Sequence, residues 1–118
     1  MKLLIVDDSL IMRKAVERSL AEKSFTVVGS AGDGVEGLRI FTETLPDLVT
    51  LDISMPKMDG LTCLTEILKV KKDAKVLIVS SQTDMATAAE AMERGAAGIL
   101  GKPFTPAQII EKVNEILG

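Results

Sequence analysis

Five short apolar runs, each of strand length, recur along this chain and alternate with longer stretches of helical period. The runs cover Lys2–Val6, Phe25–Ser30, Leu48–Leu51, Val76–Val79 and Gly98–Gly101. Most of them are continuously apolar rather than alternating, which is typical of strands buried on both faces. The pattern therefore predicts strands that are covered by helices on both sides.

The stretches between these runs carry the residues that start and stop helices. Four polar residues stand where N-caps are expected: Asp33, Asp59, Asp84 and Thr105. Thr105 is followed by Pro106 and Gln108, which is the pattern of a capping box, and Gly95 suits the position after a helix end. The fourth helical stretch has a face of small and apolar residues that we expect to pack inward: Met85, Ala88, Ala89 and Met92.

The element order is therefore strand then helix, five times over 118 residues. Repeated units of this kind predict an α/β fold with a parallel sheet and helices on both faces. The length leaves room for one domain, which we expect to span residues 1–118. In such a sheet, ligands bind beyond the carboxyl ends of the strands, so the residues just after each strand are the candidates for a site.

Composition excludes several functional classes. The net charge of −3 argues against a nucleic-acid binder, which should present a basic face. No stretch approaches the ~20 apolar residues of a membrane helix, and the single cysteine, Cys63, suits a reducing compartment, so we expect a soluble cytoplasmic protein. The chain has no histidine, so its chemistry must use carboxylates, hydroxyls, lysines or a metal.

Five side chains with useful chemistry close or follow these strands: Asp7, Asp8, Asp52, Ser80 and Lys102. Each alone has an ordinary explanation; Asp7 and Asp8, for example, could be turn and N-cap residues. Together they lie at one predicted sheet edge. Three carboxylates in one crevice repel each other, so at least one pKa would rise without a counter-charge.

A hard divalent cation such as Mg²⁺ would relieve that repulsion, since it prefers oxygen ligands and often joins carboxylates to phosphate oxygens. Lys102 offers a positive charge suited to phosphate, and Ser80 offers a hydroxyl that can hydrogen-bond a phosphoryl oxygen. Asp52 is the natural nucleophile, because a carboxylate can attack phosphorus and form an acyl phosphate. The sequence thus predicts phosphoryl chemistry at Asp52.

At these residues the chain resembles the CheY-like response-regulator receiver domains of two-component signalling. The resemblance rests on four segments in order, and it covers essentially the whole chain: Leu4–Ser9, Leu51–Leu61, Val79–Ser81 and Gly101–Phe104. It implies the flavodoxin-like doubly wound (βα)5 fold with strand order 2-1-3-4-5.

The resemblance also implies a role for each residue of the site. Asp52 would be the phosphoacceptor, and the protein ligands of Mg²⁺ would be Asp8, Asp52, Asp7 through a water, and the backbone carbonyl of Ser54. Ser80 would be the switch hydroxyl, and Lys102 would bind the phosphoryl group and precede a cis bond to Pro103. Ser54 and Gln82 stand at positions that tune dephosphorylation in this family.

One position departs from the family pattern. Members with an aromatic switch carry Tyr or Phe three residues before the lysine, where this chain has Ile99. The output face, formed by the fourth helix, fifth strand and fifth helix, would include Met92 and Ile99. An aliphatic residue at the switch position puts the size of the output change in question, but not the phosphorylation.

The function implied is that of a stand-alone, monomeric response regulator, a phosphoacceptor signalling protein rather than an enzyme. It would take its phosphoryl group from a histidine kinase, or from a small donor such as acetyl phosphate. It would then control a downstream protein, such as the flagellar switch or another signalling protein, with chemotaxis as the expected pathway.

Other interpretations stay open at this point. The chain could be a phosphorelay shuttle, or the receiver of a larger regulator such as a chemotaxis methylesterase. A phosphohydrolase would want a second acid at Ser54, and a flavin binder would want aromatic residues and no Asp7-Asp8 pair beside a phosphate. A receiver that binds partners without phosphorylation is opposed by the intact acidic, serine and lysine set.

Overall fold

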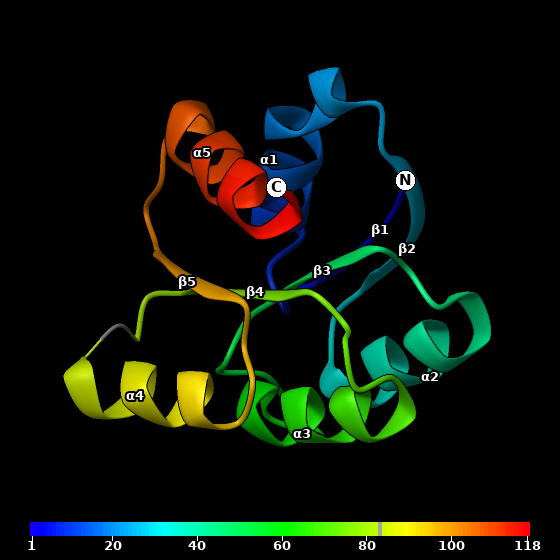
Figure 1. Ribbon diagram of the computed structural model, residues 1–118, viewed down its shortest axis with the longest axis vertical. Helices are drawn as coiled ribbons and strands as arrows, with labels where there is room; N and C mark the ends of the chain where they lie inside the picture. Colours follow the sequence, from blue (N-terminus) through cyan, green and yellow to red (C-terminus); the bar gives the residue numbers. More distant parts are fainter. Residues whose placement is uncertain (83) are drawn as a thin grey trace.

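A five-stranded parallel sheet forms the middle layer of the computed structural model, which describes residues 1–82 and 84–118. The strand order is β2-β1-β3-β4-β5 (Figure 1). The strands are β1 Lys2–Val6, β2 Thr26–Ala31, β3 Leu48–Leu51, β4 Val76–Ser80 and β5 Gly98–Gly101. The predicted α/β class, strand count and strand order are confirmed, and only β2 and β4 differ from the expected bounds, by one residue.

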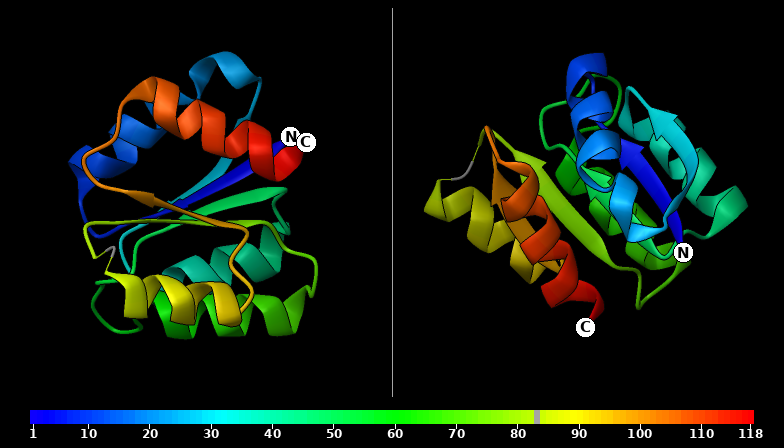
Figure 2. Two further views of the ribbon diagram at one scale, coloured as in Figure 1. Left: turned by 60° about the vertical axis from the view of Figure 1, so that its left-hand side comes forward. Right: turned by 90° about the horizontal axis from the view of Figure 1, so that it is seen from above.

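Helices cover both faces of this sheet. They are α1 Leu10–Ser19, α2 Gly34–Thr44, α3 Gly60–Val70, α4 Met85–Glu93 and α5 Pro106–Leu117, with a short 3-10 helix at Ala21–Lys23. Figures 1 and 2 show α1 and α5 on one face and α2, α3 and α4 on the other. In the described part of the chain, no helix is long and apolar enough to cross a membrane.

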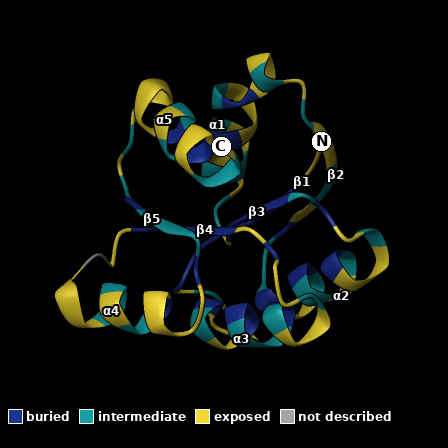
Figure 3. Cartoon of the chain, viewed as in Figure 1, coloured by how far each residue is buried: buried dark blue, intermediate teal, exposed yellow. Residues whose placement is uncertain are grey.

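The core lies on both sides of the sheet, because successive residues of a strand point to opposite faces. In β1, Leu3 and Ile5 belong to the core under α1 and α5, whereas Leu4 and Val6 belong to the core over α2 and α3. Figure 3 shows β1, β3 and β4 almost entirely buried. This two-sided burial explains why the strands read as continuous apolar runs.

The helix starts agree with the capping residues. Each predicted N-cap side chain accepts a hydrogen bond from a backbone N–H three residues later, and Thr105 and Gln108 form the full capping box. Gly95 follows α4 with a φ of +106°, the left-handed region that suits glycine. The N-cap of α1 is Ser9, and neither Asp7 nor Asp8 takes that role.

The expected inner face of α4 is wrong. Met85 is 89% exposed and Met92 is 49% exposed, while Ala91 is the buried residue of this helix. A helix rich in alanine has little contrast in apolarity between its faces, so the pattern could not decide which face packs. The two methionines instead lie on the outside, and Met92 lines a hollow together with residues of β5 and α5.

Candidate functional site

The carboxyl ends of β1, β3, β4 and β5 bring the predicted residues to one edge of the sheet. Val6 pairs with Leu51, so Asp7 and Asp52 emerge side by side, and the N–H of Asp52 donates to the Val6 carbonyl at 2.9 Å. Farther along the same edge, where β4 and β5 end, the N–H of Lys102 donates to the Ser80 carbonyl at 2.9 Å. Strand register therefore places residues from distant parts of the sequence around one crevice.

Asp7 is buried, and its polar groups are engaged. Its Oδ1 accepts from the N–H of Ser9 at 2.9 Å, which closes the turn into α1. Its Oδ2 accepts from Lys102 Nζ at 2.6 Å, and its backbone carbonyl accepts from Arg13 Nη1 at 2.6 Å. One carboxylate oxygen of Asp7 thus stabilises the turn into α1, and the other pairs with the ammonium group of Lys102.

Asp52 is 5% exposed and lies against the same lysine. Its Oδ1 accepts from the N–H of Ile53 at 2.8 Å, and its Oδ2 lies 3.6 Å from Lys102 Nζ. Burial raises the pKa of Asp52, and the neighbouring carboxylates of Asp7 and Asp8 add to the rise, while Lys102 opposes it. One raised carboxyl pKa was predicted, but its largest cause is burial rather than repulsion.

The three carboxylates fit a small divalent cation. One oxygen each of Asp7, Asp8 and Asp52 lies within 4.8 Å of the others. Two oxygens on opposite sides of Mg²⁺ are about 4.2 Å apart, since each bond is ~2.1 Å. A small movement of these side chains would therefore bring their oxygens within bonding distance of one ion. Asp8 is exposed, and an exposed oxygen can reach such an ion while water fills the other positions.

Ser80 ends β4 and is buried. Its Oγ accepts from the N–H of Gln82 at 3.0 Å. A hydroxyl that accepts one hydrogen bond keeps its proton free to donate, so Ser80 can still offer a donor to an anion in the crevice.

Ser54 and Gln82 join the loops that follow β3 and β4. Ser54 Oγ donates to Gln82 Oε1 at 2.8 Å, and both residues are exposed. A hydroxyl therefore occupies the place where a phosphohydrolase would need its second acid. The role of the Ser54 carbonyl as a metal ligand stays a prediction.

The loop after Asp52 is held close to the phosphoacceptor position. A Cβ on Gly60 would lie 2.0 Å from the Asp52 carbonyl oxygen, and the Gly60 N–H donates to the Ile53 carbonyl at 2.7 Å. Glycine at position 60 is therefore required by the close approach of two backbones.

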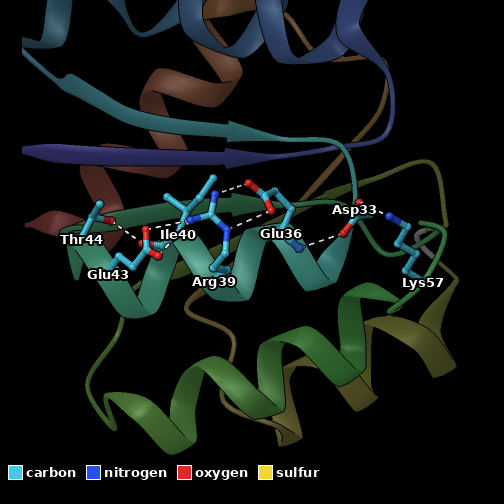
Figure 4. A network of polar contacts seen from close by, with 7 residues as sticks. All are labelled: Asp33, Glu36, Arg39, Ile40, Glu43, Thr44 and Lys57. Carbon is cyan, nitrogen blue, oxygen red and sulfur yellow. Dashed lines mark hydrogen bonds and ion pairs between the residues drawn. The ribbon is translucent and has the colours of Figure 1, made fainter.

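In the same loop, Lys57 has a φ of +68°, and its Nζ lies 3.7 Å from Asp33 Oδ2 at the start of α2. Figure 4 shows this Lys57–Asp33 contact beside a row of polar contacts along α2. In that row, Arg39 pairs with Glu36 and Glu43 on the exposed face of the helix. Exposed ion pairs of this kind contribute little to stability. The row is therefore a solvated helix face and not a second site.

Ile99 lies in β5, half-buried, on the side of the sheet that carries α4. Together with Met92 of α4 and with Lys112 and Glu115 of α5, it lines a hollow of about 330 Å³. The surface predicted to be the output face is therefore mixed, apolar and charged, and its role stays a prediction. The Lys102-Pro103 bond is cis, as the resemblance implied.

Arg13 was missed in reading the sequence. It lies on α1, one turn past Ser9, and reaches back to the Asp7 carbonyl. The signal available was a cation in the first turns of a helix, where the helix dipole disfavours it, in a helix that begins shortly after two aspartates.

Comparisons with known proteins agree with this geometry. Residues 3–114 match the family described as response regulator receiver domain. The chain is 35% identical to the chemotaxis protein CheY of Thermotoga maritima over 115 residues, which cover 98% of this chain and 96% of that protein. CheY of Bacillus subtilis is also 35% identical, over 98% of this chain and 97% of that protein.

Solved structures give the same result. The CheX-CheY-BeF3-Mg²⁺ complex from Borrelia burgdorferi matches with a TM-score of 0.97 and 32% identity, over 100% of this chain and 90% of that chain. The response regulator domain of Thermotoga maritima CheB matches with a TM-score of 0.91 and 31% identity, over 99% of this chain and 96% of that one. The span matched by the family, residues 3–114, contains Asp7, Asp8, Asp52, Ser80 and Lys102.

Proposed function

The chain belongs to the response regulator receiver family, and on this premise we propose that it accepts a phosphoryl group on Asp52 and changes its partner-binding surface in response. The observation that carries this proposal is the buried convergence of Asp52, Asp7 and Lys102 at the carboxyl edge of the sheet. A nearly buried carboxylate beside a cation, with two more carboxylates at hand, suits aspartyl phosphorylation better than any other chemistry available to this chain.

The residues divide the work as follows. An Asp52 oxygen attacks phosphorus, the new P–O bond forms as the bond to the leaving group breaks, and Lys102 balances negative charge on the transferred group. Mg²⁺, held by Asp8, Asp52, the Ser54 carbonyl and, through water, Asp7, would neutralise phosphoryl oxygens in the same step. Ser80 donates its free proton to a phosphoryl oxygen.

The proposed donor is the phosphohistidine of a histidine kinase. These 118 residues contain no histidine, so the phosphohistidine would lie outside them, and its imidazole nitrogen would leave with the electrons of the P–N bond. Small acyl phosphates such as acetyl phosphate carry the same kind of transferable group. We therefore propose a kinase partner in the cell and use acetyl phosphate as the laboratory donor.

Phosphorylation adds about two negative charges beside Ser80 and Lys102. Movement of these residues displaces the ends of β4 and β5, which lead into α4 and α5. The surface that responds is the face of Met92, Ile99, Lys112 and Glu115. With Ile99 at the switch position, the response involves repacking of an aliphatic side chain rather than rotation of an aromatic ring.

We propose a monomeric cytoplasmic protein whose residues 1–118 form one receiver domain. Chemotaxis is the proposed pathway because CheY proteins of several bacteria are similar over nearly their full length. The downstream partner would be a flagellar switch or another signalling protein. A phosphorelay shuttle is the alternative pathway role, and the similarity to a CheB receiver keeps a methylesterase context as a second alternative.

The test is labelling by acetyl phosphate in the presence of Mg²⁺, read by intact mass spectrometry. Wild-type protein should gain one phosphoryl group, and Asp52→Asn should gain none. Asp73→Asn, the same change at an exposed turn residue away from the site, should label like wild type. Removing Mg²⁺ with a chelator should abolish labelling, and undiminished labelling of Asp52→Asn would refute the assignment.

A further inference from the structure

We propose that Arg13 is a positioning residue of the metal site, which holds the Asp7-Asp8 turn through the backbone carbonyl of Asp7. The inference rests on the proposed function, since it concerns the same acidic crevice. It adds a residue that lies outside the acidic set and acts on the metal only through the main chain.

The contact is short and charge-assisted. Arg13 Nη1 lies 2.6 Å from the Asp7 carbonyl oxygen, slightly shorter than the ~2.7–2.9 Å that is usual for charge-assisted hydrogen bonds. The arginine also approaches the loop after β2, because a Cβ on Gly32 would lie 3.3 Å from the same Nη1. Arg13 therefore ties α1 to the end of β1 beside the loop that leads into α2.

Asp8 depends on this turn for its position. Its carboxylate is exposed, and no group in the described residues hydrogen-bonds it. Its place is therefore set by the backbone of its neighbours: Ser9 is fixed by the Asp7 side chain, and the Asp7 carbonyl is fixed by Arg13. The peptide that joins Asp7 to Asp8 is the one that Arg13 holds.

The Arg13 contact becomes more important when a metal binds. Asp7 Oδ2 accepts a hydrogen bond from Lys102 Nζ. A cation or its water that approaches this oxygen competes with the lysine ammonium. The carbonyl contact of Arg13 does not compete with the metal, so it can keep the turn in place in both states.

The arginine is not placed here for stability alone. Its Nε is buried, and no hydrogen-bond partner for it lies in the described residues. A buried, unpaired N–H destabilises the folded state, which offsets much of the benefit of the Nη1 contact. The net contribution of Arg13 to stability is therefore expected to be small, and its short contact with the Asp7 carbonyl points to the site.

The positioning role and a charge role predict opposite signs. Loss of a cation close to three carboxylates should strengthen metal binding by electrostatics alone. Loss of a residue that orients the ligands should weaken it, typically by about tenfold for partners outside the ligand set. The direction of the change in affinity therefore decides between the two roles.

The experiment measures Mn²⁺ binding from the electron paramagnetic resonance signal of the free ion, with Mg²⁺ as competitor. The chain has no tryptophan or tyrosine, so intrinsic fluorescence is a poor probe. Arg13→Met should bind Mn²⁺ about tenfold more weakly than wild type. Arg13→Lys, which keeps the charge and a donor, should recover most of the affinity, and Lys14→Met, on the exposed side of α1, should match wild type.

Urea unfolding without metal supplies the second readout. The Arg13→Met midpoint should stay close to the wild-type value, whereas a purely structural role would lower it and leave the affinity of the folded protein unchanged. Equal or tighter Mn²⁺ binding by Arg13→Met overturns the inference. If that variant does not fold, Arg13→Gln takes its place with the same expectations. A wild-type protein that binds no Mn²⁺ would instead refute the proposed function.

Discussion

Lys102 is paired with Asp7 more closely than with Asp52: its Nζ lies 2.6 Å from Asp7 Oδ2 and 3.6 Å from Asp52 Oδ2. One partly buried ammonium thus compensates carboxylates that end or follow two different strands. We expect a phosphoryl group that binds in the crevice to compete with Asp7 for this lysine, and a metal ion to compete with the lysine for Asp7.

Lys102→Met should lower the free energy of unfolding of the metal-free protein by about 3 kcal/mol, because two nearly buried carboxylates lose their counter-charge. Saturating Mg²⁺ should restore much of this loss by supplying the missing positive charge. Urea unfolding followed by circular dichroism, with and without Mg²⁺, measures both effects. Lys112→Met, which removes a surface ion pair with Glu115, should cost less than about 1 kcal/mol in either condition. Equal losses with and without Mg²⁺ for Lys102→Met would contradict the expectation.

Asp52→Asn should stabilise the metal-free protein at neutral pH. Burial raises the pKa of Asp52 above its unfolded value, so the ionised carboxylate is the less favourable form in the folded state. The free energy of unfolding of the wild type should therefore decrease as the pH rises from about 4, the pKa of the unfolded state, through the raised pKa of Asp52 in the folded state. Thermal unfolding from pH 4 to pH 7.5 should show the variant gaining on wild type across that window. A stability difference that is constant with pH, or that Asp73→Asn reproduces, would argue against this origin.

Gly60→Ala should destabilise the fold by about 3 kcal/mol, because the new Cβ would lie 2.0 Å from the Asp52 carbonyl oxygen and backbone must move. The same movement should slow labelling of Asp52 by acetyl phosphate. Gly98→Ala is the matched control, since its Cβ would meet side chains and no backbone, with Ile116 at 3.2 Å and Leu77 at 3.5 Å. Urea unfolding and labelling rates check both variants, and comparable effects of the two would show that the contact with Asp52 is not special.

Ser80→Ala should separate phosphorylation from its readout. Labelling at Asp52 should persist, because the nucleophile, the lysine and the carboxylates remain in place. The change in amide chemical shifts that phosphorylation produces around Met92 and Ile99 should be largely lost, since the hydroxyl that follows the phosphoryl group is gone. Two-dimensional NMR of the labelled protein measures this, with Ser81→Ala as the exposed neighbouring control. Full shift changes in Ser80→Ala would mean that the surface responds by another route.

Much of this fold can be predicted from local patterns in the sequence. Continuous apolar runs predict the buried strands, since a strand covered on both faces has no polar side. Side chains that satisfy free backbone N–H groups mark the helix starts at Asp33, Asp59, Asp84 and Thr105. The alternation of strands and helices then places Asp7, Asp8, Asp52, Ser80 and Lys102 at one edge, before any distance is known.

The specific contacts between side chains and backbones were decided only by the tertiary structure. Strand register and side-chain reach decide that Lys102 lies nearer to Asp7 than to Asp52, that Gly60 meets the backbone of Asp52, and that Arg13 turns back to the Asp7 carbonyl. The outward face of α4 belongs here too, because alanine-rich helices carry too little contrast to choose a side. The sequence by itself determined which chemical groups lie at one edge of the sheet. The packing of five strands and their helices decided which of these groups are in direct contact.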